Sequence, residues 1–72
     1  MSKVKPGYYR HFKGNKYLVI GTAKHSETLE ELVVYVSLYE NETSQIWVRP
    51  VELFLEKIER EGKTVPRFKF IS

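Results

Sequence analysis

The stretch that most constrains this chain runs from Leu32 to Tyr39, in the middle of the sequence. Its even-numbered positions are all aliphatic, whereas the odd-numbered positions carry Val33, Tyr35, Ser37 and Tyr39. Alternation of β-branched and aromatic residues with period two, uninterrupted by Gly or Pro, is typical of a strand paired on both edges. One face of this strand is aliphatic and the other is amphipathic. We therefore expect the rest of the chain to pair with this strand or to cover it.

Length and composition restrict the chemistry that is available. A chain of 72 residues forms one domain with a small core, and such a domain buries only about 60% of its unfolded surface. The sequence has no cysteine and two histidines, so we expect no disulfide, no metal site and no cofactor. No apolar run approaches a membrane span, and the first residues do not resemble a signal peptide. These observations predict a soluble, cytoplasmic protein with no membrane partner.

The charges are arranged in blocks along the sequence. Residues 1–24 hold six basic side chains and residues 62–72 hold three more, and neither segment has an acid. All nine acids are Glu and lie between Glu27 and Glu61. If the terminal strands are neighbours in the fold, their charges combine into one positive face. The alternative is that the charges scatter once the chain folds.

Two strands are expected before the central one. Residues 1–6 are predicted to be a flexible tail ahead of a single domain over residues 7–72. Residues 7–13 and 16–24 both alternate, and Gly14-Asn15 between them suits a two-residue hairpin turn. Gly21 suggests a bulge in the second strand. In the loop that follows, Thr28 and Glu31 match a capping box and allow one helical turn.

The segment after Pro50 has two possible structures. Apolar residues at Val51, Phe54, Leu55 and Ile58 have helical spacing, which predicts a helix of about three turns ending near Gly62. The alternative is a single turn near residues 50–54 and then a hairpin, with residues 54–59 paired with residues 65–71. Local patterns alone favour the helix slightly.

Several separated motifs resemble one family. They are Gly-Tyr-Tyr-Arg-His-Phe-Lys-Gly-Asn (7–15), Ala-Lys-His-Ser-Glu-Thr (23–28), Leu-Val-Val-Tyr (32–35), Trp-Val-Arg-Pro (47–50), Phe54 and Val-Pro-Arg-Phe (65–68). Together they are similar to a bacterial family of short proteins, domain-of-unknown-function family 1653. The resemblance implies a mostly β domain, a small SH3-like barrel of about five to six antiparallel strands with a short helical turn near residues 50–54. It also implies the hairpin instead of the longer helix, and neighbouring first and last strands. It implies no particular activity.

The strongest candidate for a binding surface combines Trp47, Arg49 and Tyr35. Trp47 and Arg49 share one face of a short strand, and Tyr35 lies on the amphipathic face of the central strand. Paired strands would present an aromatic and guanidinium surface, which can stack bases or hold a phosphate or carboxylate. The competing interpretation is a core tryptophan beside an Arg49–Glu ion pair. Four basic residues would add a positive rim if the two ends converge, or they would simply keep the barrel soluble and protect exposed strand edges: Arg10, Lys13, Arg67 and Lys69.

The histidines are weaker candidates. His11 and His25 titrate near neutral pH, but their spacing matches no metal motif and contiguous His25-Ser26-Glu27 is not the arrangement of a catalytic triad. We assign no catalytic residue and count both histidines among the ligand-binding candidates. The sequence therefore predicts a binding module for an anionic partner, either nucleic acid or another phosphate-bearing ligand. The alternatives are a protein-interaction domain that binds a peptide in an aromatic groove, and a small enzyme using His11 or His25.

Overall fold

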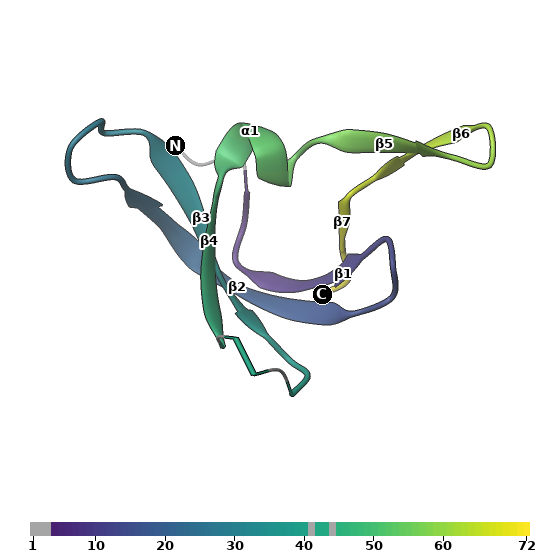
Figure 1. Ribbon diagram of the computed structural model, residues 1–72, viewed down its shortest axis with the longest axis horizontal. Coiled ribbons are helices and arrows are strands. Elements are labelled where there is room, and N and C mark those ends of the chain that lie inside the picture. Colours follow the sequence, from purple (N-terminus) through teal and green to yellow (C-terminus); the bar gives the residue numbers. More distant parts are fainter. Residues whose placement is uncertain (1–3, 41, 44) are drawn as a thin grey trace.

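The computed structural model describes residues 4–40, 42–43 and 45–72 (Figure 1). Across these residues the chain is mostly strand, with one short helix between the fourth and fifth strands. The elements are β1 (Gly7–His11), β2 (Lys16–Lys24), β3 (Glu31–Ser37), β4 (Ile46–Pro50), α1 (Val51–Phe54), β5 (Lys57–Arg60), β6 (Lys63–Pro66) and β7 (Phe68–Phe70). The predicted mostly β class is confirmed, and α1 falls at the predicted helical turn.

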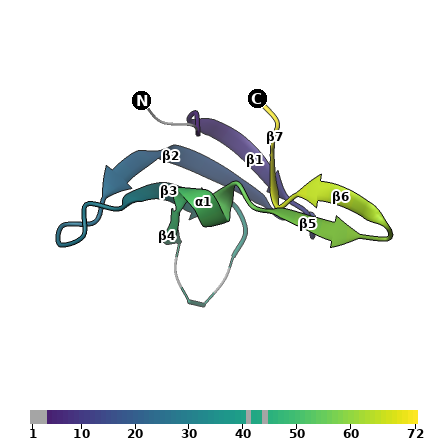
Figure 2. The same cartoon turned by 90° about the horizontal axis from the view of Figure 1, so that it is seen from above.

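Two antiparallel sheets make up the fold. The larger sheet has the order β4-β3-β2-β1-β7, and β5 pairs with β6 in a separate hairpin. Both views show this hairpin extending away from the body, on the side opposite the β2–β3 loop (Figures 1 and 2). Pairing between described residues does not continue from β7 round to β4, so the curled sheet is open. The SH3-like barrel therefore stays a prediction within a confirmed mostly β class.

The first and last strands are neighbours, as the resemblance implied. In the β1–β7 pair, Tyr9 lies opposite Phe70, Arg10 opposite Lys69, and His11 opposite Phe68. The basic N-terminal and C-terminal segments therefore meet on one side of the molecule. This arrangement is the first requirement for the predicted positive face.

The core lies on the concave side of the large sheet. There β3 contributes Val33 and Tyr35, which are 0% and 5% exposed. Phe54 from α1 stacks against Phe68 from β7, with ring centroids 4.3 Å apart and planes 6° from parallel. Tyr9 from β1 meets Phe54 edge-on at 5.4 Å. Each buried ring stabilises the fold by about 1.5–3 kcal/mol, and each well-placed ring pair adds about 0.5–1.5 kcal/mol.

The aliphatic face of the central strand points outward. Val34 and its even-numbered neighbours on β3 are only partly buried, and Ile46 and Val48 on β4 are 60% and 58% exposed. The alternation thus identified the strand but did not show that its amphipathic face is the buried one. The amphipathic face is the buried one because Phe54 from α1 and Phe68 from β7 pack against Tyr35 on that side.

The ambiguous segment after Pro50 is a short helix followed by a hairpin. The helix ends at Phe54, and β5 and β6 are joined by Glu61 and Gly62, whose φ angles are 53° and 77°. Two consecutive positive φ angles define the type I′ turn that suits a two-residue hairpin. The predicted pairing of residues 54–59 with 65–71 is wrong beyond Pro66. The β5–β6 strand pairs end with Lys57 opposite Pro66, one further backbone bond runs from the Arg67 N–H to the Glu56 carbonyl, and residues 68–70 pair with β1 instead.

Two predicted turns have different structures. Of the Gly14-Asn15 pair only Gly14 has a positive φ, 105°, so a two-residue turn of the I′ type cannot form. The turn spans residues 12–15, and the His11 N–H donates to the Asn15 carbonyl at 2.8 Å. The predicted bulge is confirmed, because the β2–β3 register shifts between Val19 and Gly21.

The β2–β3 loop is not helical. Instead of a Thr28–Glu31 capping box, the N–H groups of Glu27 and Thr28 donate to Nδ1 of His25 at 3.1 and 3.3 Å. Glu31 is already the first residue of β3 and lies opposite Lys24. Pairing with β2 therefore prevails over the local helical preference.

The predicted tail is only partly within the described residues. Residues 1–3 lie outside them, whereas Val4 is 3% exposed and belongs to the core. The hydroxyl of Tyr9 donates to the carbonyl of Lys5 at 2.8 Å and attaches this segment to β1. Among the described residues, no helix has the length and apolar character needed to cross a membrane.

Candidate anion-binding site

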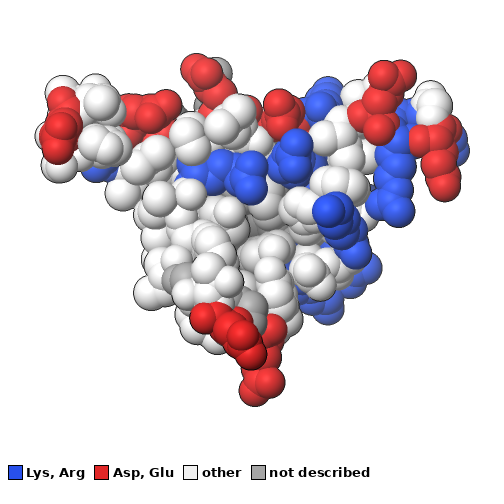
Figure 3. Space-filling view, viewed as in Figure 1, with Lys and Arg blue, Asp and Glu red and all other residues white. Residues whose placement is uncertain are grey.

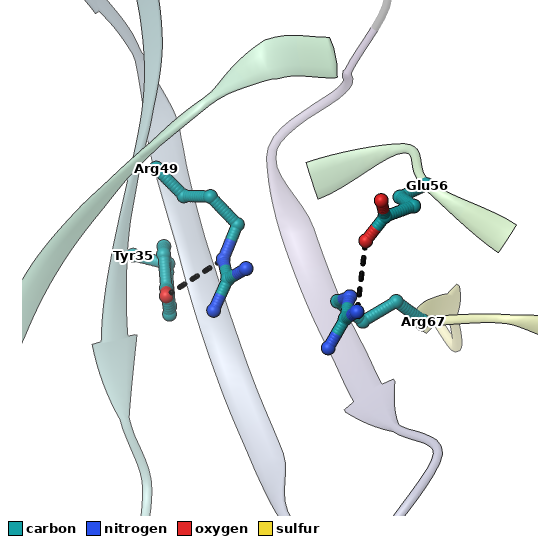
Figure 4. Close-up of polar contacts among 4 residues, drawn as sticks. All are labelled: Tyr35, Arg49, Glu56 and Arg67. Carbon is teal, nitrogen blue, oxygen red and sulfur yellow. Dashed lines mark hydrogen bonds and ion pairs between the residues drawn. The ribbon is translucent and has the colours of Figure 1, made fainter. Parts of the chain in front are cut away.

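Strand β4 delivers an arginine to the open side of the core. Trp47 and Arg49 alternate with exposed Ile46 and Val48, so both face the concave side, and Trp47 lies directly opposite Tyr35 on β3. The Arg49 Nε–H donates to the Tyr35 hydroxyl over a long 3.5 Å (Figure 4). Its guanidinium carbon lies 5.6 Å from the centre of the Phe68 ring. Arg49 is thus positioned by strand pairing and by two aromatic neighbours.

A second arginine approaches from the opposite side. Arg67 follows β6, and its Nη2 donates to Oε1 of Glu56 at 2.8 Å. The two backbones are also joined, because the Arg67 N–H donates to the Glu56 carbonyl at 3.0 Å. Figure 4 shows the guanidinium groups of Arg49 and Arg67 pointing into the same space, one from β4 and one from the β6–β7 connection. We call this space the arginine mouth; Arg49, over Tyr35 and Phe68, borders it on one side, and Arg67, paired with Glu56, borders it on the other.

The arginine mouth carries more positive than negative charge. Among the described residues, 4–40, 42–43 and 45–72, there is one ion pair, and it joins Arg67 to Glu56. It is partly exposed, with 25% and 45% of the side-chain surfaces accessible, and such pairs contribute about 0.2–1 kcal/mol. Arg49 has a neutral hydroxyl as its partner. Figure 3 shows basic side chains beside the central hollow and down its right flank, and acidic side chains along the upper edge and at the lower tip of the molecule.

Two buried donors add to this polarity. The Nε atom of Arg67 and the Nε1 atom of Trp47 are buried, and neither has a hydrogen-bond partner. Leaving a buried donor without a partner costs about 1–3 kcal/mol. A buried polar group without a partner is uncommon in native proteins, and a functional role or a bound water or ion is the usual explanation. The Nε of Arg67 lacks a hydrogen-bond partner within the described part of the protein, whereas the Nη2 of the same side chain is paired with Glu56.

His11 lies on the same side of the core and is held neutral. Its ring meets Phe68 edge-on at 5.0 Å, and its Nδ1 accepts a hydrogen bond from the Lys13 N–H at 3.2 Å. Burial lowers the pKa of His11 below its usual 6.5, and the positive charges of Arg67, Lys13 and Arg49 lower it further. Because Nδ1 is an acceptor, the proton of the neutral ring is on Nε2. The neutral ring of His11 is therefore a hydrogen-bond donor through Nε2, and positively charged side chains surround it.

The tyrosines of this region are also neutral. The hydroxyls of Tyr17 and Tyr39 are hydrogen-bonded at 2.9 Å, and burial followed by this bond raises the pKa of Tyr17. Burial likewise raises the pKa of Tyr9. Neither Tyr17 nor Tyr9 thus adds a negative charge near Arg49. Since Arg49 itself occupies the space above Phe68, these rings do not form a cage for a cationic ligand.

The structure brings together only some of the predicted residues. His11, Tyr35, Arg49 and Arg67 surround or adjoin the arginine mouth, and Trp47 lies beside Tyr35. Tyr35, at 5% exposed, is not available to stack on a base as predicted, because its face of β3 is the inner one. Its hydroxyl positions Arg49 instead.

The remaining predicted residues lie elsewhere. Arg10 is on the outer face of β1, and the Nζ of Lys13 is 5.8 Å from the Phe12 ring at the β1–β2 turn. His25 holds the β2–β3 loop, separated from the His11 end by the nine residues of β2, or about 30 Å. No group of three or more potential metal ligands occurs among the described residues. The enzyme hypothesis required the two histidines to lie close together, and they do not.

Sequence reasoning missed several members of the site. Glu56, Phe68 and Tyr17 were not among the predicted site residues. The Nη1 of Arg60 donates to the Phe12 carbonyl at 2.8 Å, a contact between residues 48 positions apart. Phe68 could have been found from its place beside Arg67 in the Val-Pro-Arg-Phe motif. Nothing local to Arg60 indicates its contact.

The fold and this site define a small, mostly β domain in which one arginine, Arg49, lies over an aromatic core without an acidic partner among the described residues. The chain belongs to the family described as "Protein of unknown function (DUF1653)", whose model matches residues 7–70. It is similar to the crystal structure of a protein of this family from Bordetella bronchiseptica, with a TM-score of 0.90 and 35% sequence identity. The match covers 96% of this chain and 88% of that one. No curated protein matches the chain.

Proposed function

We propose that this domain is a cytoplasmic binding module, built on an SH3-like scaffold, for an anionic ligand that presents a phosphate group. The observation that carries the proposal is the arginine mouth, where two guanidinium groups face one space and, in the part of the chain that the structure describes, only that of Arg67 is paired with a carboxylate. Arginine suits this role because its planar fork of donors matches the oxygens of a phosphate. The mostly apolar surroundings strengthen each such contact by excluding water.

The surrounding groups favour an anion over other ligands. The neutral His11 supplies a further donor at Nε2, and neither Tyr17 nor Tyr9 supplies a competing negative charge. A bound phosphate would also reduce the repulsion between Arg49 and Arg67. The proposal includes no catalytic step, because no nucleophile and base lie together with a general acid at this place.

Titration with adenosine monophosphate, with adenosine as the uncharged comparison, tests the proposal. We expect the Nε–Hε NMR signals of Arg49 and Arg67 to shift with the nucleotide and not with the nucleoside. Arg49→Gln should weaken binding about tenfold or more, since a hydrogen bond to a charged group contributes about 1.5–3 kcal/mol. The matched control is Lys24→Gln, which removes one exposed positive charge from the far end of β2 and should change binding less than twofold.

Two results would overturn the proposal. One is equal nucleotide affinity in wild type and Arg49→Gln. The other is binding that hardly changes between 50 and 300 mM salt, because contacts among partly exposed charges are screened by added ions. The second result would favour the peptide-groove alternative instead.

A further inference from the structure

A second basic feature adjoins the arginine mouth. A cleft of about 370 Å³ lies between the β1–β2 turn and the β5–β6 hairpin, and we call it the Phe12 cleft. Basic and apolar side chains both line it, chiefly Arg10, Phe12, Arg60, Val65, Pro66 and Lys69. On the same side of the molecule Figure 3 shows a concentration of Lys and Arg side chains. The Phe12 cleft therefore has an apolar floor with cationic walls.

Phe12 is surrounded by positive charge. The guanidinium carbons of Arg60 and Arg67 lie 5.7 and 5.9 Å from the centre of its ring, and the Nζ of Lys13 lies 5.8 Å away. Arg60 is fixed there by its bond to the Phe12 carbonyl. Neighbouring Glu59 alternates to the other face of β5, so it does not neutralise Arg60 within the cleft. Arg67 touches Phe12 and also borders the arginine mouth, and it thus joins the two features.

A row of three cations continues from the Phe12 cleft across the outer face of the sheet. Arg10 on β1 lies directly opposite Lys69 on β7 and directly opposite Lys16 on β2. All three are exposed, and adjacent strands are only about 4.8 Å apart. Like charges placed directly opposite one another destabilise a sheet. An anionic chain lying along this row would remove that repulsion.

The geometry points to a single strand of nucleic acid as the ligand. On this inference, which rests on the proposed function, one phosphate lies between Arg49 and Arg67. The following phosphates cross the Phe12 cleft to Arg10 and Lys69. The ring of Phe12 is partly exposed and meets the His11 ring at 4.5 Å, and its remaining surface is the one offered to an unpaired base. A duplex keeps its bases paired and cannot use that ring, so the strand is single.

Fluorescence anisotropy with labelled dT10, alongside the adenosine monophosphate titration, tests the inference. Three phosphate contacts predict a slope of log K against log salt of about −2, because single strands give about −0.7 per contact. Replacing both Arg10 and Lys69 by Gln should weaken dT10 binding about tenfold and reduce the slope by about 1.4, while nucleotide affinity stays unchanged. The matched control is Lys24→Gln with Lys57→Gln, which removes the same charge from exposed positions outside the row.

The outcomes separate the inference from the proposed function. If the nucleotide binds in an Arg49-dependent way but dT10 binds no more tightly, the inference is wrong and the proposed function holds. If neither ligand depends on Arg49, the proposed function is wrong as well. Equal binding of dT10 and a ten-base-pair duplex would overturn the single-strand assignment, as would dT10 binding that is insensitive to the Arg10 and Lys69 substitutions.

Discussion

Two adjacent valines on the central strand test which face of the sheet is the core. Val33 is 0% exposed on the concave side, whereas Val34 is partly exposed on the outer face. Val33→Ala removes two buried carbons, or about 1.6 kcal/mol, and the unfilled cavity raises the loss to about 2–3 kcal/mol. Val34→Ala removes the same atoms from the outer face and should cost about 1 kcal/mol. Both substitutions lower β propensity equally, so this contribution cancels in the comparison.

Urea unfolding followed by circular dichroism measures both variants. A domain of this length has a free energy of unfolding of about 4–11 kcal/mol, so the Val33→Ala loss is a large part of the total. Its thermal midpoint should fall by about 10–20 °C, at about 4–8 °C per kcal/mol for domains of this size. A loss for Val34→Ala equal to or greater than that for Val33→Ala would refute the assignment of the inner face.

Two further predictions concern the charges of the arginine mouth. The pKa of His11, followed by NMR, should lie below 6.5 in the free protein and rise when adenosine monophosphate binds, because a phosphate would offset the charges of Arg67 and Arg49. Between its lowered pKa and pH 6.5, His11 is protonated in the unfolded chain and not in the folded chain, so the contribution of His11 to stability is complete above pH 6.5 and falls as the pH drops below it. The His11→Gln substitution should flatten this pH dependence. A measured His11 pKa above 6.5 would contradict the burial argument. Glu56→Gln should lower the free energy of unfolding by less than about 1 kcal/mol, because the ion pair it removes is partly exposed. The same substitution should tighten nucleotide binding, because it removes the carboxylate that competes with the phosphate for Arg67. Weaker nucleotide binding would show instead that Glu56 serves to orient Arg67.

The strands were predictable because they depend on local pattern, whereas the choice of buried face was not. Leu32 to Tyr39 alternates so regularly that β3 follows from the sequence alone. Which of its faces is buried depends on α1 and β7, whose rings reach the concave side from residues 54 and 68. The β5–β6 hairpin turns at Glu61 and Gly62, which both have a positive φ. A glutamate rarely adopts a positive φ, so the sequence at Glu61 did not indicate this turn.

The site was predictable in part for the same reason. Arg49 and Trp47 share a face through strand alternation, and the meeting of the basic ends follows once β1 and β7 are neighbours. The partnership of Arg67 with Glu56 was not predictable, because it depends on where the β5–β6 ladder ends. Contacts across 11 residues or more are set by topology and not by local sequence.

Phe68 has a double role that decides which substitutions are informative. It stacks on Phe54, meets Tyr35 and His11, and lies under Arg49, so it is at once the centre of the core and the floor of the arginine mouth. Truncating it would cost about 3–5 kcal/mol, as for other buried aromatic residues, and would remove fold and site together. The cations around it are different, because they are at the surface and carry little of the stability. Binding and folding can therefore be separated in this domain by changing its charges, and not by changing its rings.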